Sequence, residues 1–155
     1  MVGGNSYRSF DGTTGGYLSL AVLYGDDLDP DALTGALGVA PSRSECKGEV
    51  FVGKAGRSRV VKTGYWRLQS ENNLSGDMDI QIAEMLAQMT DSDVVWRDLS
   101  QRYDGRIFFG WFLTSGNDMA DISAQTLQAC AARGLAFCFD IYNFTDESAE
   151  PLATA

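Results

Sequence analysis

The strongest constraint on the fold is a short segment, 106–114, that is almost uniformly apolar. Between Arg106 and Thr114 the chain reads Ile-Phe-Phe-Gly-Trp-Phe-Leu. A strand with large apolar side chains on both of its faces has to be covered on both sides, which is typical of the interior of a sheet. The segment therefore predicts a central strand.

Three further regions have the periodicity of strands. Residues 17–24 alternate between two faces, and residues 136–143 place Phe137, Phe139 and Ile141 together on a face that we expect to point inward. Residues 49–52 and 60–68 are predicted to form a hairpin whose loop is 53–59. Residues 41–47 are expected to be irregular.

Helix signals separate these strands. Asp29 is a natural N-cap before Pro30, and Gly38 ends the short helix that follows. A second helical region begins at 76–77 and is interrupted and re-capped at 90–93, so that 77–103 forms one kinked helix or two. A last helix begins at Ser123 and ends at Gly134.

The resulting order, β-α-β-β-α-(α)-β-α-β, favours an α+β fold. The nearest common plan is a ferredoxin-like sandwich with an added α-β unit, a mostly antiparallel sheet and helices on one face. A chain of 155 residues corresponds to one domain, which we expect at 17–144. The glycine-rich residues 1–16 are expected to be a flexible N-terminal arm, and 145–155 a flexible C-terminal tail.

Composition excludes several classes of function. The chain contains no histidine, which excludes a Ser-His-Asp triad, a Cys-His dyad and a His-ligated zinc site. The three cysteines, Cys46, Cys130 and Cys138, form no C-x-x-C pair, so we expect neither a disulfide framework nor a zinc knuckle. The net charge of −9 argues against nucleic acid and anionic membranes as partners. Without a signal peptide or a membrane-length apolar run, the expected location is the cytoplasm.

Two motifs suggest ligands, but simpler interpretations explain them. Residues 48–54 match G-x-x-x-x-G-K, yet Ala55 stands where a phosphate loop needs Ser or Thr, and a strand follows in place of a helix. Residues 27–31 resemble the start of a calcium loop but lack its glycine and its closing glutamate. Helix capping explains these carboxylates better, with a weak cation site at Asp26 and Asp27 as the alternative. We therefore expect no metal and no cofactor.

Charge is distributed unevenly along the chain. Residues 43–67 carry seven basic and two acidic side chains, a net charge of +5, on a remainder with a net charge of −14. One interpretation is a solvated hairpin whose lysines and arginines protect an edge strand from aggregation. The other is a site for an anionic ligand or an acidic partner at Arg57, Arg59 and Arg67. Trp66 adjoins this site in sequence, but it faces away from Arg67 unless the strand bulges.

The last strand carries one further candidate. Asp140 and Tyr142 lie on the face opposite to Phe139. If that face lines a cleft, Asp140 is the best candidate for a buried carboxylate and a general base, whereas on a solvent-exposed face it is unremarkable. The candidate ligand-binding residues are Arg57, Arg59, Trp66, Arg67, Asp140 and Tyr142, and no catalytic residue is assigned.

Several segments together resemble the bacterial domain-of-unknown-function family numbered 4279. The segments that carry the resemblance are Gly25-Asp26-Asp27-Leu28-Asp29-Pro30, Leu37-Gly38, Thr63-Gly64-Tyr65-Trp66-Arg67-Leu68 and Phe139-Asp140-Ile141-Tyr142. They span about 17–143. The resemblance implies an α+β domain and supplies neither an established activity nor catalytic residues.

Three functions stay open at this point. The first is a non-catalytic protein-interaction or regulatory binding module, which requires a contiguous apolar or aromatic patch on the surface. The second is a small-molecule domain that holds an anionic ligand at the basic hairpin. The third, an enzyme with Asp140 as its base, has the least support because no second polar group converges on Asp140 in the sequence.

Overall fold

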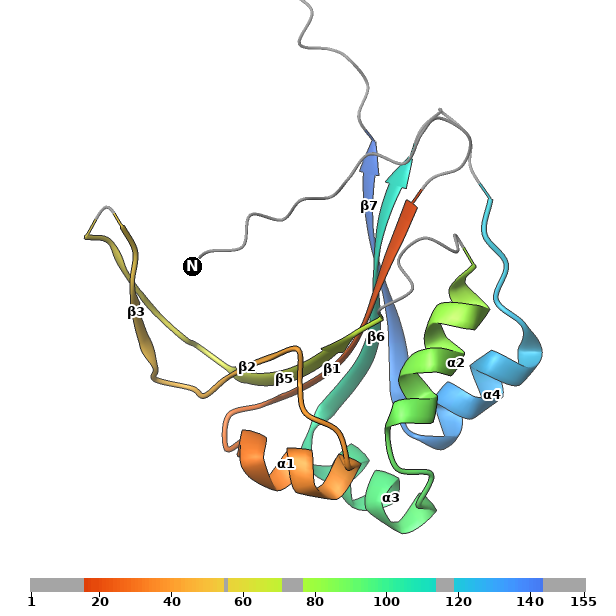
Figure 1. Ribbon diagram of the computed structural model, residues 1–155, viewed down its shortest axis with the longest axis horizontal. Coiled ribbons are helices and arrows are strands. Elements are labelled where there is room, and N and C mark those ends of the chain that lie inside the picture. Colours follow the sequence, from red (N-terminus) through yellow and green to blue (C-terminus); the bar gives the residue numbers. More distant parts are fainter. Residues whose placement is uncertain (1–15, 55, 71–76, 114–118, 144–155) are drawn as a thin grey trace, which may run out of the picture.

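The structure, a computed structural model, describes residues 16–54, 56–70, 77–113 and 119–143. In these ranges a five-stranded sheet is covered on one side by four helices, and its other side is open (Figure 1). The elements in chain order are β1 (Gly16–Gly25), α1 (Pro30–Leu37), β2 (Arg43–Glu45), β3 (Val50–Val52), β4 (Ser58–Val60), β5 (Gly64–Gln69), α2 (Met78–Gln88), α3 (Asp93–Arg102), β6 (Asp104–Leu113), α4 (Ala124–Ala132) and β7 (Leu135–Asn143).

The strand order β2-β5-β1-β6-β7 confirms the predicted fold class. Both β1-α1-β2 and β5-α2-α3-β6 are split β-α-β units, because each pair of parallel strands encloses one strand of the other unit. Together they make a ferredoxin-like core with the order β6-β1-β5-β2. The α4-β7 unit is the addition, and β7 pairs in parallel with β6 at the edge of the sheet.

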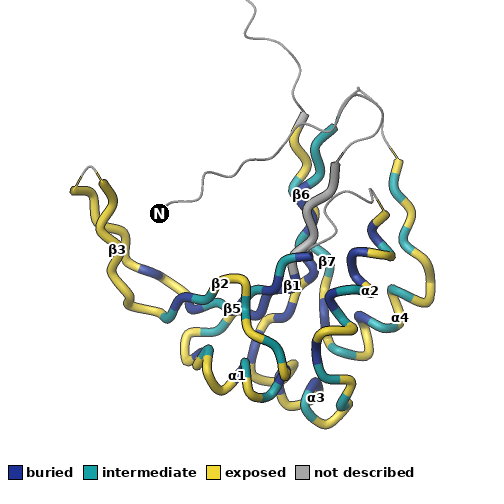
Figure 2. Tube along the Cα trace, in the orientation of Figure 1, coloured by how far each residue is buried: buried dark blue, intermediate teal, exposed yellow. Residues whose placement is uncertain are grey.

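The core lies between the sheet and the helices, where Figure 2 shows the buried segments. The apolar strand β6 is flanked by β1 and β7, so the predicted interior strand is confirmed. Ile107 and Phe109 point from β6 toward the helices and are fully buried. Trp66 of β5 and Ile82 of α2 belong to the same cluster.

Side-chain caps set the ends of the helices. Asp29 accepts hydrogen bonds from the backbone N–H groups of Asp31 and Ala32 at 3.0 and 3.2 Å, and Gly38 ends α1 with a left-handed φ of 77°. The region 77–103 forms two helices, since α2 stops before Met89 and Ser92 caps α3. Both termini of α1 therefore lie where the sequence predicts them.

The basic segment departs from the sequence-based expectation in two ways. Residues 41–47, expected to be irregular, contain the edge strand β2. The strand predicted over 60–68 is two strands: β4 pairs with β3 alone, whereas β5 pairs with β1 and β2. The chain leaves the main sheet between Val60 and Gly64, and the β3–β4 hairpin projects away from the body (Figure 1). The sequence carries a signal for this bend, because alternation fails there: two apolar residues, Val60 and Val61, are followed by two polar ones, Lys62 and Thr63.

The expectation that Phe139 and Ile141 are buried is wrong. They are 44% and 54% exposed. Phe139 does lie on the helix side, because its ring stacks on that of Phe109 at 5.1 Å between centroids. The helices, however, cover the other end of this edge strand, and only Leu135 is buried while Phe137 is partly covered (Figure 1). Asp104-Gly105 is a dipeptide typical of turns, but both residues begin β6.

The predicted tail, 145–155, and residues 1–15 of the predicted arm lie outside the described residues. Within the described ranges, the helices are too short or too polar to cross a membrane.

Candidate functional site

The side of the sheet that carries no helix, here named the open face, is rich in arginine. The strand register places Arg43, Arg67, Val22 and Arg106 in one row across β2, β5, β1 and β6. Val22 is only 4% exposed although it lies outside the core cluster. The methylene stems of arginines cover apolar surface well, and arginines flank Val22 on both sides of the row.

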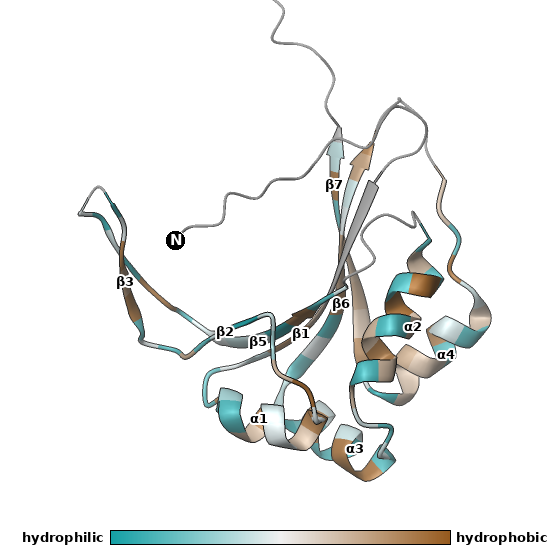
Figure 3. Ribbon diagram, in the orientation of Figure 1, coloured by the Kyte–Doolittle hydropathy of each residue, from teal (hydrophilic) through white to brown (hydrophobic). Residues whose placement is uncertain are grey.

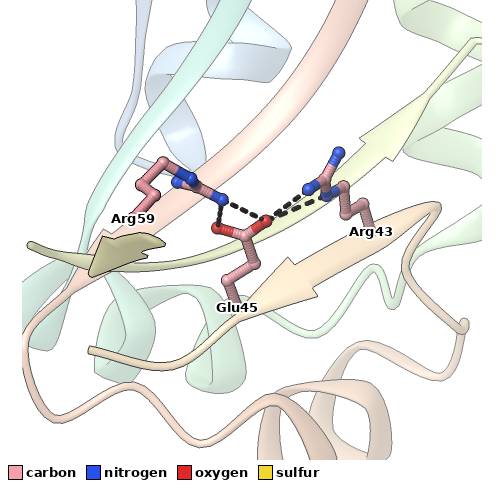
Figure 4. A network of polar contacts seen from close by, with 3 residues as sticks. All are labelled: Arg43, Glu45 and Arg59. Carbon is pink, nitrogen blue, oxygen red and sulfur yellow. Dashed lines mark hydrogen bonds and ion pairs between the residues drawn. The ribbon is translucent and has the colours of Figure 1, made fainter. Parts of the chain in front are cut away.

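A buried carboxylate organises one end of this face, as Figure 4 shows. The Glu45 side chain is 2% exposed. Arg43 donates to its Oε1 from Nε at 3.1 Å and from Nη2 at 2.5 Å, and Arg59 donates from Nη2 to Oε1 and Oε2 at 3.0 and 2.8 Å. Because Arg59 comes from β4, this network ties the projecting hairpin to the main sheet.

The network also determines the protonation of Glu45. Burial alone would raise the pKa of Glu45, but hydrogen bonds from Arg59, Tyr65 and Arg43 outweigh it and hold the pKa below its ordinary value. Burial, followed by the hydrogen bond to Glu45, raises the pKa of Tyr65. At neutral pH the cluster therefore contains an ionised carboxylate and a neutral phenol.

Arg67 lies beside this network without joining it. It is half-buried, it forms no ion pair with any described residue, and its Nε is buried without a hydrogen-bond partner there. Its register partner on β2 is Arg43, which is itself a cation. Arg106, at the other end of the row, is paired with Asp104 at 2.6 Å.

The β3–β4 hairpin has two unlike sides. The side toward the open face carries Phe51 and Arg59, whose guanidinium carbon lies 5.1 Å from the ring centroid of Phe51. The outer side carries Val50, Val52 and Val60, here named the valine surface, which are 59%, 72% and 55% exposed. Figure 2 shows the hairpin as largely exposed, and Figure 3 shows hydrophobic residues on both of its strands.

The residues that the sequence predicts for a site are only partly together. Arg59 and Arg67 both reach the open face near Glu45, while Arg57 is exposed at the hairpin loop. Trp66 faces the other way, as alternation predicts. It is fully buried, and its indole N–H donates to Thr34 Oγ1 at 3.3 Å.

Asp140 and Tyr142 lie on the open face at the far end of β7. The Tyr142 hydroxyl donates to Asp140 Oδ2, and the Tyr142 ring stacks on Phe112 with 5.0 Å between centroids. Asp140 is three strands and four register positions away from Arg67. At about 4.8 Å per strand and about 3.3 Å per residue, this separation is on the order of 20 Å. The two groups therefore do not share one small site.

Sequence reasoning missed Arg43 and Glu45. Both residues lie in 41–47, a segment with no clear strand signal, which the sequence predicts to be irregular. The signal was nevertheless present, because Arg43 and Glu45 are two residues apart and so share a face once 43–45 is a strand.

The acidic and cysteine candidates have structural explanations. Asp26 pairs with Lys47, and its pKa is lowered chiefly by that hydrogen bond. Among the described residues no group of three or more His, Cys, Asp or Glu side chains is arranged to hold a metal ion. Burial raises the pKa of the Cys130 thiol to about 11, which is typical of an unreactive core cysteine.

Two surface hollows have neither Arg43, Arg59 nor Arg67 in their lining. One is bordered by the α1–β2 connection and the end of β5, and the other by α1 and α3. The second is mostly apolar, with Leu33, Val95, Leu99 and Tyr103 in its lining. Neither hollow is lined by Asp140.

Fold and surface together define an α+β domain of ferredoxin-like topology with a projecting hairpin and an arginine-rich open face. The chain belongs to the family described as "Domain of unknown function (DUF4279)", which it matches over residues 16–144, so the resemblance read from the sequence is confirmed. Comparisons with curated proteins and with solved structures found no match.

Proposed function

We propose that this domain is a non-catalytic interaction module that binds a protein partner through the β3–β4 hairpin. The observation that carries the proposal is the valine surface. Val50 and Val60 are directly opposite each other on neighbouring strands, and Val52 lies two residues further along the same side. All three are more than half exposed.

Such a surface is unusual for a part of the chain that projects from the body. A two-stranded hairpin is only marginally stable in water, and solvent-facing positions on it are normally polar. Contiguous exposed apolar side chains rimmed by polar ones mark contact sites for other molecules. A partner that covered the three valines would remove this apolar area from water and stabilise the hairpin at the same time.

The charges around the valine surface define the chemistry of the partner. Lys54, Arg57 and Lys62 are exposed on or next to the hairpin, in a segment of net positive charge. Electrostatic complementarity favours an acidic partner and steers its approach. The partner segment should therefore carry apolar side chains flanked by aspartate or glutamate.

The test uses defined peptides, not an unidentified partner. Fluorescence anisotropy measures binding of a labelled peptide in which valine alternates with glutamate, and of its matched lysine counterpart. We expect saturable binding of the acidic peptide, weakened at least tenfold in the triple variant Val50→Thr, Val52→Thr, Val60→Thr. Val94→Thr on α3 is the matched control, because Val94 is also 72% exposed but lies on the helix side.

Three outcomes of this experiment would each contradict a different part of the proposal. Equal binding by the wild type and the triple variant would remove the hairpin from the interaction. Equal loss in the Val94→Thr control would show a general effect of apolar surface. Preference for the lysine peptide would contradict the charge of the proposed partner.

A further inference from the structure

We infer that Arg43, Arg59 and Arg67 form a binding site for an oxyanion, a carboxylate or a phosphate group, on the open face of the sheet. This site is separate from the valine surface, which lies on the other side of the hairpin. The inference does not depend on the proposed protein partner.

Positive charge is in local excess on this part of the open face. The guanidinium groups of Arg43 and Arg59 share one carboxylate, that of Glu45, and Arg67 adds a third positive charge on the neighbouring strand. Arg43 and Arg67 are register partners on adjacent strands, and like charges placed directly opposite destabilise a sheet. A second anion at this position would offset the remaining repulsion.

The three arginines also have N–H donors that are not engaged by Glu45. A guanidinium has five N–H donors, and the contacts to Glu45 engage Nε and Nη2 of Arg43 and Nη2 of Arg59. Arg67 forms no ion pair with the described residues, and its Nε is buried there without an acceptor. A buried donor without a partner is costly. Because this Nε does not touch solvent, the Arg67 side chain has to turn outward before an oxygen of the ligand can satisfy it.

Two of the three arginines are held in place before any ligand binds. Glu45 fixes the Arg43 and Arg59 head groups through its ion pairs with both. The ring of Phe51 lies against Arg59, with 5.1 Å between the guanidinium carbon and the ring centroid. Fixed guanidinium forks match the geometry of carboxylate and phosphate oxygens, and less side-chain entropy is lost on binding when they are already ordered. Glu45 is thus a positioning residue for the arginines and does not itself contact the ligand.

Nearby acidic side chains are engaged elsewhere. Asp104 pairs with Arg106, and Asp26 pairs with Lys47. Asp140 bonds to Tyr142 at the far end of the face. The described part of the domain therefore supplies Arg67 with no carboxylate, which is consistent with an anion supplied by a ligand.

The primary experiment observes the arginine Nε–Hε signals of ¹⁵N-labelled protein by NMR. The protein is titrated with inorganic phosphate in one arm and with acetate in the other, at ionic strength held constant with chloride. We expect saturable shifts at Arg43, Arg59 and Arg67, and none at Arg97, an exposed control residue on α3. Saturation in one arm or in both supports the site and identifies which oxyanion it accepts. Shifts that do not saturate, or that are equal at Arg97, would overturn it.

Variants then assign the binding to the cluster. Arg67→Gln should weaken phosphate or acetate binding at least tenfold, whereas Arg97→Gln should leave it unchanged. Unaltered affinity in Arg67→Gln would refute the assignment. The triple valine variant should bind the anion as the wild type does, so that failure of this site and failure of the protein interaction are recognised separately.

Glu45→Gln gives the most specific result. Glutamine keeps a carbonyl oxygen that can still accept from the arginine head groups, so much of their order is retained, while the internal counter-charge is lost. The anion should therefore bind more tightly, and phosphate should raise the melting temperature of this variant more than that of the wild type. A smaller rise would contradict the proposed arrangement. If Glu45→Gln does not fold, Arg59→Gln replaces it, because Arg43 still pairs with Glu45, and there we expect weaker binding than in the wild type.

Discussion

At the scale of single residues, Glu45 links the stability of the domain to pH. Its pKa is lowered in the folded protein by hydrogen bonds that outweigh its burial, so the folded state binds its proton less readily than the unfolded state. The stabilisation is therefore present above the ordinary glutamate pKa of about 4.3 and is lost as the pH falls through the folded-state value.

The substitution Glu45→Gln tests this link. Both arginines are more than half exposed and water screens them, so we expect a loss of only about 1–2 kcal/mol in the free energy of unfolding at pH 7. Because the variant cannot ionise, the difference from the wild type should narrow between pH 5 and pH 3. Urea unfolding of both proteins across that range measures the difference in their unfolding free energies. If this difference does not change with pH, the charge of Glu45 does not contribute to stability.

Gly64 is a second residue whose identity is determined by its surroundings. A Cβ at this position would lie 2.8 Å from the backbone oxygen of Gly25, its register partner on β1. Backbone cannot move aside as a side-chain end can, so Gly64→Ala should cost about 1–3 kcal/mol of unfolding free energy. Gly35→Ala is the matched control. It lies within α1 with no atom within 4 Å of its Cβ, and should stabilise by about 0.5–1 kcal/mol. Similar losses in both variants would mean that the close approach is not the cause.

At the scale of elements, the β3–β4 hairpin and β5 are parts of one continuous segment with unequal support. All six residues of β3 and β4 are exposed, whereas β5 alternates between buried and half-buried residues and pairs on both sides. Local opening of the hairpin exposes little new apolar surface, so it should cost little free energy.

Amide hydrogen exchange tests this difference. We expect the paired amides of β3 and β4 to exchange at least roughly 100-fold faster than those of β5 at the same pH. Binding of a partner to the valine surface should reduce the difference. Equal protection of the hairpin and β5 in the free domain would show that the Glu45 network fastens the hairpin more firmly than its burial suggests.

The hairpin also shows where prediction from sequence stops. Its existence and its charge could be predicted from 49–52 and 60–68. Its departure from the sheet is marked only by a break in alternation at 60–63, and such a short break does not show which strand the hairpin pairs with. The misplacement of Phe139 and Ile141 has a related cause. Periodicity assigned them to one face correctly, but how far the helices extend over that face depends on packing between distant segments.

At the scale of the whole molecule, the alternation of helices and strands was enough to predict an α+β, ferredoxin-like plan with one added unit, although the second strand of the core is β2 and not the predicted strand at 49–52. Loop lengths and caps are local properties, and Asp29, Pro30 and Gly38 determine both ends of α1. The strand order is not a local property, because neighbouring strands of the sheet come from distant parts of the chain. The periodicity of each segment does not show which other strand it pairs with. The candidate site is divided in the same way: Arg59 and Arg67 could be predicted from charge, whereas Glu45 became visible only when β2 was placed beside β5. The cytoplasmic location stays a prediction.

The two edges of the sheet differ greatly in length. β2 offers three residues, two of them charged, whereas β7 offers nine residues with a single charge, that of Asp140. Within the described ranges each of these strands has only one neighbour. Short edge strands with charged side chains resist pairing between molecules, whereas longer apolar edge strands permit it. If a second copy lengthened the sheet, we would expect it to pair through β7. Two copies joined there by a two-fold axis would have the short β2 strands at both ends, so that such an assembly would close as a pair and not grow into a filament.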